Sequence, residues 1–235
     1  MRQSNAYILM YSAAITVVCG GLLAFAAVSL KPMQDANIAM EQKKNILSSV
    51  LTLKEGENID EIYSKKVNGF VIDFEGNVKD GMKPEQVIIA AEYKKLPKDR
   101  LLPVYEFRND SNKVEFAVMP VYGYGLWNNI WGFVAVKSDF NTIQGVKFQH
   151  AGETPGLGAR IESEEIQERF KGKQIFDNGT LTAVAIQKGE GNNYDQELHK
   201  VDGMSGATLT GKGVNNMLKD YLACYEKYLK KNSGV

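Results

Sequence analysis

The sequence predicts an α+β fold, in which a single N-terminal transmembrane helix precedes a domain of mixed strands and helices. Three features support this. The stretch Gln3–Leu30 contains no charged side chain. Strand-like segments then lie close together between Pro103 and Lys147, and the clearest helical periodicity lies near the C-terminus. Because the strands are grouped and do not alternate regularly with helices, a parallel βαβ architecture is not expected.

The N-terminal stretch is predicted to be a membrane anchor. Ala6–Leu30 is almost wholly apolar or small, and as a helix it would span about 37 Å, which exceeds the roughly 30 Å hydrocarbon core of a bilayer. A cleaved signal peptide is the alternative, with a possible cleavage site at Ala24–Ala26. The apolar region of a signal peptide usually runs to only about 7–15 residues, so an uncleaved anchor is favoured.

The few charges beside the anchor indicate its orientation. Arg2 lies on the N-terminal side, and Lys31 begins a segment of mixed charge on the other side. By the positive-inside rule, residues 1–5 are expected to be a short cytoplasmic N-terminus, and everything after the anchor is expected to lie on the outer side of the membrane.

Residues 31–100 are expected to form the N-terminal part of the extracytoplasmic region, and residues 101–235 the main domain. Apolar residues at helical spacing from Ile38 to Leu51 predict an amphipathic helix that leads away from the anchor. Gly69–Gly76 predicts a strand. The other predicted elements are strands at Val114–Val121, Gly132–Val136 and Leu181–Ile186 and a helix around Ile161–Phe170.

The clearest element is a C-terminal helix. Its apolar residues from Val214 to Leu229 fall on one face of about four helical turns. The preceding segment, Val201–Gly213, is rich in glycine and hydroxyl side chains. Thr210 is a candidate N-cap, and the free N–H groups at a helix N-terminus favour a phosphate. The residues alone therefore predict either a phosphate-binding turn or an ordinary capped helix start.

Composition excludes several classes of function. The 28 basic and 28 acidic residues balance, so no overall field favours nucleic acid. Two cysteines and two histidines cannot supply an iron–sulfur cluster or a Cys/His zinc site. Redox chemistry would therefore need an organic cofactor.

Two catalytic functions are suggested by motifs that match the sequence incompletely. Gly206–Lys212 fits the P-loop pattern G-x-x-x-x-G-K, but Gly213 stands where a P-loop needs Ser or Thr, and the preceding residues are polar. Ser205 and His199 suggest a hydrolase, but the sequence lacks the G-x-S-x-G elbow.

Three motifs resemble those of the FMN-binding domain family. Asp202–Thr208, with the sequence DGMSGAT, is similar to the flavinylation motif D-x-x-[ST]-G-A-[TS] of that family. Glu153–Gly158 resembles its second signature, and Gly125–Trp127 followed by Trp131–Phe133 resembles its third. The motifs occur in the order of the family and cover roughly Tyr122–Tyr221.

The resemblance implies that FMN is bound covalently, by a phosphoester to the hydroxyl of Thr208. A separate flavin transferase would move FMN from FAD onto this hydroxyl. Asp202 would be recognised in that reaction; otherwise it is a turn-forming residue. The small residues that would let the ester protrude are Ser205, Gly206 and Ala207. Thr210 is the competing acceptor, and the motif alone selects Thr208.

The same resemblance implies a flavin-ring site. The residues that would wrap the isoalloxazine ring are Glu153, Thr154, Gly156, Leu157 and Gly158. In this site Leu157 would pack on the face of the ring and Thr154 would hydrogen-bond to it. Trp127 is either a wall of the site or a tryptophan of the hydrophobic core. Lys188 lies either near the flavin and its phosphate or in a solvated loop.

Membrane-anchored members of the family serve as electron carriers. Sodium-translocating NADH:quinone oxidoreductases contain one, and Rnf-type ferredoxin:NAD complexes contain a related G subunit. The match around Glu153–Arg160 and the long segment after the anchor favour the quinone reductases. The resemblance thus implies one component of a membrane complex of six subunits in the bacterial inner membrane, with its C-terminal domain periplasmic. It would pass electrons from NADH towards quinone while the complex exports sodium.

Such a subunit would not be active alone, because the sequence shows no dinucleotide fingerprint and no multi-helix channel. The expected partners are the other subunits, a flavin transferase during maturation and membrane lipid. Neither nucleic acid nor a bound metal is expected. The alternatives are the G subunit of an Rnf complex and a membrane-anchored binding module without a cofactor.

Overall fold

The computed structural model describes residues 4–54, 56–109 and 111–233. The chain divides into two compact units, Met1–Gln42 and Lys43–Val235. The second unit combines a β-sheet with helices, which confirms the α+β prediction.

One continuous helix, α1, runs from Asn5 to Ser48, and from Asn5 onward the first unit consists of this helix. The predicted anchor and the predicted helix after it are therefore parts of a single element. Pro32 lies inside α1, where its missing N–H removes one backbone hydrogen bond. By length and composition, α1 can cross a membrane. Arg2, on which the expected orientation partly depends, lies outside the described residues.

The end of α1 belongs to the core of the second unit. Ile46 and Leu47 are buried, and they pack in one cluster with Tyr105, Val118 and Phe133 from the sheet. This contact explains why the helical periodicity extends beyond the length that a bilayer requires.

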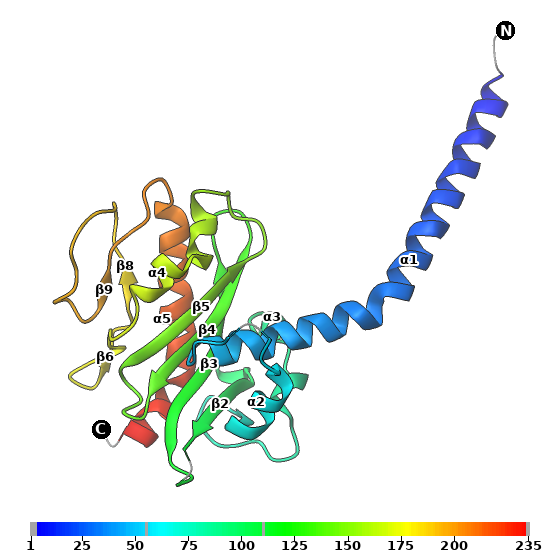
Figure 1. Cartoon of the computed structure of the whole chain (residues 1–235). Helices are drawn as coiled ribbons and strands as arrows, with labels where there is room; N and C mark the ends of the chain where they lie inside the picture. Colours follow the sequence, from blue (N-terminus) through cyan, green and yellow to red (C-terminus); the bar gives the residue numbers. More distant parts are fainter. Residues whose placement is uncertain (1–3, 55, 110, 234–235) are drawn as a thin grey trace. The chain divides into compact units, whose positions relative to one another are not determined.

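The second unit is built on one antiparallel sheet of five strands in the order β1-β2-β3-β4-β5 (Figure 1). The strands are β1 (Val67–Ile72), β2 (Leu102–Arg108), β3 (Val114–Tyr124), β4 (Asn129–Lys137) and β5 (Ile143–His150). The predicted β region is confirmed. The first strand ends at Ile72, before the predicted end at Gly76, because the Asp73 carboxylate accepts the N–H groups of Glu75 and Asn77 and closes a turn.

Both faces of the sheet are covered. Along β3, Ala117, Met119 and Val121 face one core, whereas Val118 faces the cluster that contains the end of α1. The first core is covered by the C-terminal helix α5 (Thr208–Ser233), which lies along the sheet in Figure 1.

One tyrosine ties α5 to the sheet. The buried Tyr225 hydroxyl lies 2.9 Å from the carbonyl oxygen of Pro103 and 3.2 Å from that of Pro120. The predicted C-terminal helix is thereby confirmed, and it begins upstream of the apolar residues that predicted it.

The connections contain only short elements. They are α2 (Ile59–Lys66), η1 (Pro84–Gln86), α3 (Ile89–Glu92), η2 (Pro97–Asp99), η3 (Gly158–Glu162), α4 (Glu164–Glu168), β6 (Phe176–Asp177), β7 (Thr180–Leu181), β8 (Ala185–Ile186) and β9 (Lys200–Val201).

Two predicted elements differ from the structure. The helix expected around Ile161–Phe170 is divided into η3 and α4 at Ser163, whose hydroxyl accepts the Ile166 N–H as an N-cap. The strand expected at Leu181–Ile186 is broken at Ala183, which adopts φ +59°. Its two ends, β7 and β8, pair with β6 and β9 respectively.

Candidate functional site

The motif that precedes α5 forms an exposed turn. The Ala207 N–H donates to the Met204 carbonyl across 3.1 Å, and Gly206 has φ +74°. A four-residue turn with a positive φ at its third position strongly favours glycine there. Ser205 and Gly206 are exposed, and the half-buried Thr208 follows as the first residue of α5. We call Met204–Ala207 the acceptor turn.

Thr210 has a different environment from Thr208. It is 1% exposed, and its Oγ1 donates to Glu153 Oε2 across 2.6 Å. Because α5 begins at Thr208, the predicted N-cap role of Thr210 is wrong. The hydroxyl that competes with Thr208 in the sequence is therefore buried and already hydrogen-bonded.

Glu153, in the second motif, contacts the loop of the third motif and the first turn of α5. It is 3% exposed, and its Oε1 accepts the N–H groups of Trp127 at 2.9 Å and Asn128 at 3.4 Å, while Oε2 accepts from Thr210. Burial opposes ionisation of this carboxyl, but the hydrogen bonds from Thr210 and the backbone outweigh it, so its pKa lies below the usual value. Both carboxylate oxygens of Glu153 therefore hold the protein's own loops together.

The second motif folds as the predicted tight turn. The Leu157 N–H donates to the Thr154 carbonyl across 3.1 Å, with Gly156 at φ +76°. Thr154, Gly156 and Leu157 are exposed. Gly158 is buried, and a side chain there would overlap Thr210 and Glu153. Leu157 also lies beside the acceptor turn, because a Cβ on Gly206 would be 2.7 Å from its Cδ2.

Large apolar side chains are exposed on these same segments. They are Tyr124, Leu126, Trp127, Leu157 and Leu209. Trp127 is 70% exposed, so the interpretation of it as a core residue is wrong. Exposed apolar side chains gathered at one place mark a surface that binds a ligand or a partner. Leu157 places part of this apolar surface beside Gly206, two residues before Thr208.

Asp202 is held by the loop that joins β8 to β9. Its Oδ2 accepts the Gly191 N–H at 2.7 Å, and its Oδ1 accepts from the Asn192 side chain at 3.3 Å. Burial raises the pKa of Asp202, but these hydrogen bonds more than offset it and hold the pKa below its usual value. Lys188 lies in the same loop and is exposed.

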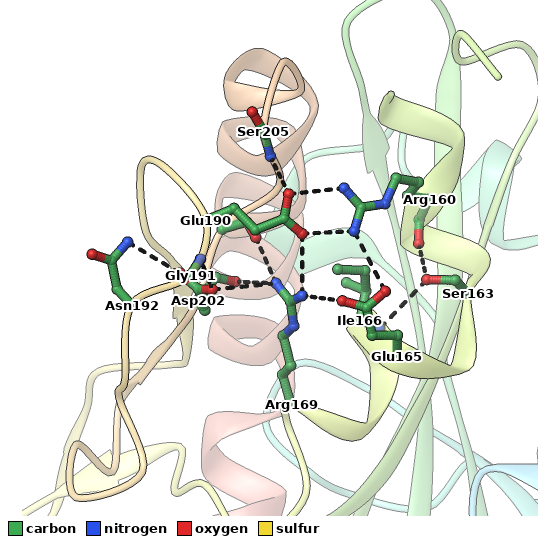
Figure 2. Close-up of polar contacts among 11 residues, drawn as sticks. Arg160, Ser163, Glu165, Ile166, Arg169, Glu190, Gly191, Asn192, Asp202 and Ser205 are labelled. Carbon is green, nitrogen blue, oxygen red and sulfur yellow. Dashed lines mark hydrogen bonds and ion pairs between the residues drawn. The ribbon is translucent and has the colours of Figure 1, made fainter. Parts of the chain in front are cut away.

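Sequence reasoning missed three residues at this site. Arg160, Arg169 and Glu190 form a network with Asp202 and Ser205 (Figure 2). No local pattern marks them, since each is an ordinary charged residue beside a turn. The nearest signal was the glycine pair around Glu190.

Residues 125–223 match the family described as FMN-binding domain. The C subunit of the Na(+)-translocating NADH-quinone reductase from Haemophilus ducreyi is 34% identical over 228 residues, which are 87% of this chain and 84% of that protein. The C subunit from Pseudomonas aeruginosa is 32% identical, with coverage of 94% and 92%.

Solved structures of C subunits also match this chain. The crystal structure of the C subunit from Parabacteroides distasonis matches with a TM-score of 0.74 at 33% identity, covering 85% of this chain and 96% of that one. The structure of Shewanella oneidensis NqrC matches with a TM-score of 0.69 at 29% identity, covering 83% and 97%.

Proposed function

Because this chain belongs to the family of C subunits of the Na(+)-translocating NADH-quinone reductases, we propose that it is an electron carrier whose FMN is bonded, through its phosphate, to the hydroxyl of Thr208. The observation that carries the proposal is the contrast between two nearby threonines. Thr208 follows an exposed turn, whereas Thr210 is buried against Glu153. The bound flavin would supply reversible electron transfer.

The attachment is a group transfer in which this chain provides only the nucleophile. The Thr208 oxygen forms a bond to the FMN phosphorus of FAD while the pyrophosphate bond breaks. AMP leaves and the hydroxyl proton is lost to solvent. A separate flavin transferase would catalyse this step and recognise Asp202 within the motif. The acceptor turn leaves room for the ester because it contains the small residues Ser205, Gly206 and Ala207.

The exposed apolar side chains suit the flavin ring. Leu157 and Trp127 are exposed on the two loops that Glu153 joins, which supports the proposal that both would pack against the isoalloxazine ring. In this proposal the Thr154 hydroxyl and the backbone of Gly156 and Gly158 would meet its polar edge. Glu153 holds these loops in position, and Lys188, in the β8–β9 loop, would add a positive charge near the flavin or its phosphate.

The carrier would act within a membrane complex of six subunits. Electrons from NADH would reach the flavin through a neighbouring subunit and leave towards quinone, while the complex exports sodium. The apolar surface around Trp127 and Leu157 is where a partner's redox group would have to approach. The family assignment favours this complex over the Rnf alternative.

We further propose that α1 anchors the chain in the inner membrane, with the flavin domain on the periplasmic side. The support is the uncharged stretch to Leu30 and the charges that flank it. External protease added to spheroplasts should digest the domain while the inner membrane stays intact. Protection of the domain until detergent is added would reverse the orientation.

Covalent attachment is tested directly on the full chain made together with a flavin transferase. After denaturation and acid precipitation, the pellet should remain yellow, and the band should fluoresce in a gel. A colourless pellet with all flavin in the supernatant would show that FMN is not bonded to the chain.

A further inference from the structure

The loop between β8 and β9 lies directly against the first half of the flavin motif. Gly203 permits this contact, because a side chain at that position would overlap the carbonyl oxygens of Gln187 and Gly189. Asp202 reinforces it by accepting the Gly191 N–H. The loop is shaped for this contact by Gly189 and Gly191, which adopt φ +91° and +89°.

Glu190, in this loop, holds the acceptor turn. Its Oε2 accepts the Ser205 N–H at 2.9 Å. Arg160 donates to both oxygens of the same carboxylate, at 2.9 Å to Oε2 and 2.6 Å to Oε1. Figure 2 shows the carboxylate between two guanidinium groups, the second of which is Arg169, whose Nη2 lies 3.3 Å from Oε1. Bidentate guanidinium–carboxylate pairs are the most directional ion pairs in proteins.

Arg169 holds the motif by its backbone as well. Its Nη1 donates to the Gly203 carbonyl at 2.5 Å and approaches the Asp202 carbonyl at 3.3 Å. Arg160 and Arg169 come from η3 and from the end of α4. They therefore connect the motif to elements that pack on the core. We call Glu190, Arg160 and Arg169 the Glu190 clamp.

The acceptor turn is thus tied on both sides. The Glu190 clamp holds residues 202–205 upstream, and the Glu153–Thr210 hydrogen bond holds the first turn of α5 downstream. Ser205 and Gly206, the two central residues of the turn, are exposed between these two attachments. A turn fixed at both ends presents one backbone shape to solvent, whereas an untied turn of the same sequence would sample many.

We propose that the Glu190 clamp is a recognition determinant for covalent flavin attachment, which holds the acceptor turn in the one shape that the flavin transferase binds. Its three members are positioning residues, because they act through the backbone of the motif. This inference rests on the proposed function, namely that Thr208 accepts FMN.

The clamp acts on binding and leaves the chemical step alone. When only a fraction of a substrate has the competent shape, its apparent affinity falls by that fraction, while the rate at saturation is unchanged. If losing the clamp leaves about one chain in ten in the competent shape, the KM for the chain as substrate rises about 10-fold. The kcat of the transferase should stay within about 2-fold, because the bound turn is the same.

The experiment measures kcat and KM of a flavin transferase, with FAD and Mg²⁺, on the full chain in detergent. Glu190→Gln keeps the size of the side chain but removes the charge that holds both arginines. Arg160 holds the pKa of Glu190 at about 2, so the wild-type carboxylate is ionised throughout the assay range. We expect the KM to rise about 10-fold.

Glu165→Gln is the matched control. The Glu165 side chain pairs with the same two arginines, Arg160 and Arg169. Its side-chain hydrogen bonds in the described part of the chain go to these arginines and not to residues 202–205. Glu165→Gln therefore removes the same charge as Glu190→Gln but breaks no contact to residues 202–205. We expect the KM of the Glu165→Gln chain to stay within about 2-fold of wild type.

A second readout reports the shape of the turn without any enzyme. The Ser205 N–H is held by Glu190, so hydrogen exchange at this amide should accelerate in Glu190→Gln and not in Glu165→Gln.

Arg160→Lys keeps the charge but loses the bidentate geometry, and it should shift the KM in the same direction as Glu190→Gln. Thermal unfolding of each variant shows whether the domain remains folded.

The outcomes separate this inference from the proposed function. If the wild-type chain takes up no flavin, the proposed function is wrong. If the wild type is labelled and Glu190→Gln has a wild-type KM, the clamp is not a recognition determinant. An equal rise of KM in Glu165→Gln would assign the effect to charge alone, and a fall of kcat without a rise of KM would place it in the chemical step. Each of these results overturns the inference.

Discussion

Thr208→Ala should abolish covalent flavin attachment completely. The substitution removes the only atom that can form the proposed ester and leaves the surrounding turn in place. In-gel fluorescence of denatured protein, made together with a flavin transferase, should fall to background. The loss in free energy of unfolding should be small, since Thr208 lies at the first position of α5 and is only half-buried.

Two neighbouring hydroxyls supply the controls. Ser205→Ala should keep the label, because Ser205 is contacted through its backbone N–H. Thr210→Ala should also keep the label, although it should lower the free energy of unfolding by about 1–3 kcal/mol, since the buried Glu153 carboxylate loses a hydrogen bond. Fluorescence that survives in Thr208→Ala, or disappears only in Thr210→Ala, would move the acceptor to another residue.

A fragment that begins at Pro32 should fold as a soluble protein and still accept FMN. Its compact unit starts at Lys43, so the fragment keeps the buried residues Ile46 and Leu47 at the end of α1. A fragment that begins at Thr52 loses both side chains and uncovers part of one face of the sheet. Removal of one buried Leu or Ile typically costs about 2–5 kcal/mol, so this shorter fragment should be largely unfolded by circular dichroism.

The flavin of the longer fragment should respond to dithionite but not to NADH. The sequence offers no glycine-rich fingerprint for the pyrophosphate of a dinucleotide, so hydride delivery from NADH needs a partner subunit. Anaerobic mixing with NADH, followed by the absorbance of oxidised flavin, should show no saturable bleaching. Rapid bleaching that saturates with NADH would make the chain an independent dehydrogenase and contradict the carrier proposal.

Local patterns in the sequence were enough for several conclusions. An uncharged apolar stretch predicts a membrane-crossing helix, and a face of apolar residues predicts α5, because each depends on neighbours within a few positions. The resemblance of Asp202–Thr208 to a family motif also lies within a short segment, and the choice of Thr208 as acceptor stays a prediction. The turn in Glu153–Gly158 followed from its proline and glycines alone. These features are encoded within short segments, so tertiary contacts did not change them.

Other elements could not be predicted because distant residues decide them. The expected strand at Leu181–Ile186 breaks at Ala183, where the Thr182 and Ala183 N–H groups donate to the Ile175 carbonyl. The periodicity near the anchor predicted a helix but not that Ile46 and Leu47 would be buried on the sheet.

The sequence by itself determined that the chain carries an apolar helix long enough to cross a membrane, a β-rich domain, a long C-terminal helix and a motif with two candidate threonines. Only the tertiary structure gave the two threonines different environments. Thr210 is buried with its hydroxyl paired to Glu153, 57 positions away, and the acceptor turn is clamped because Arg160 reaches Glu190 across 30 positions. Burial and ion pairing depend on which segments the fold brings together, and that information is spread over the whole chain.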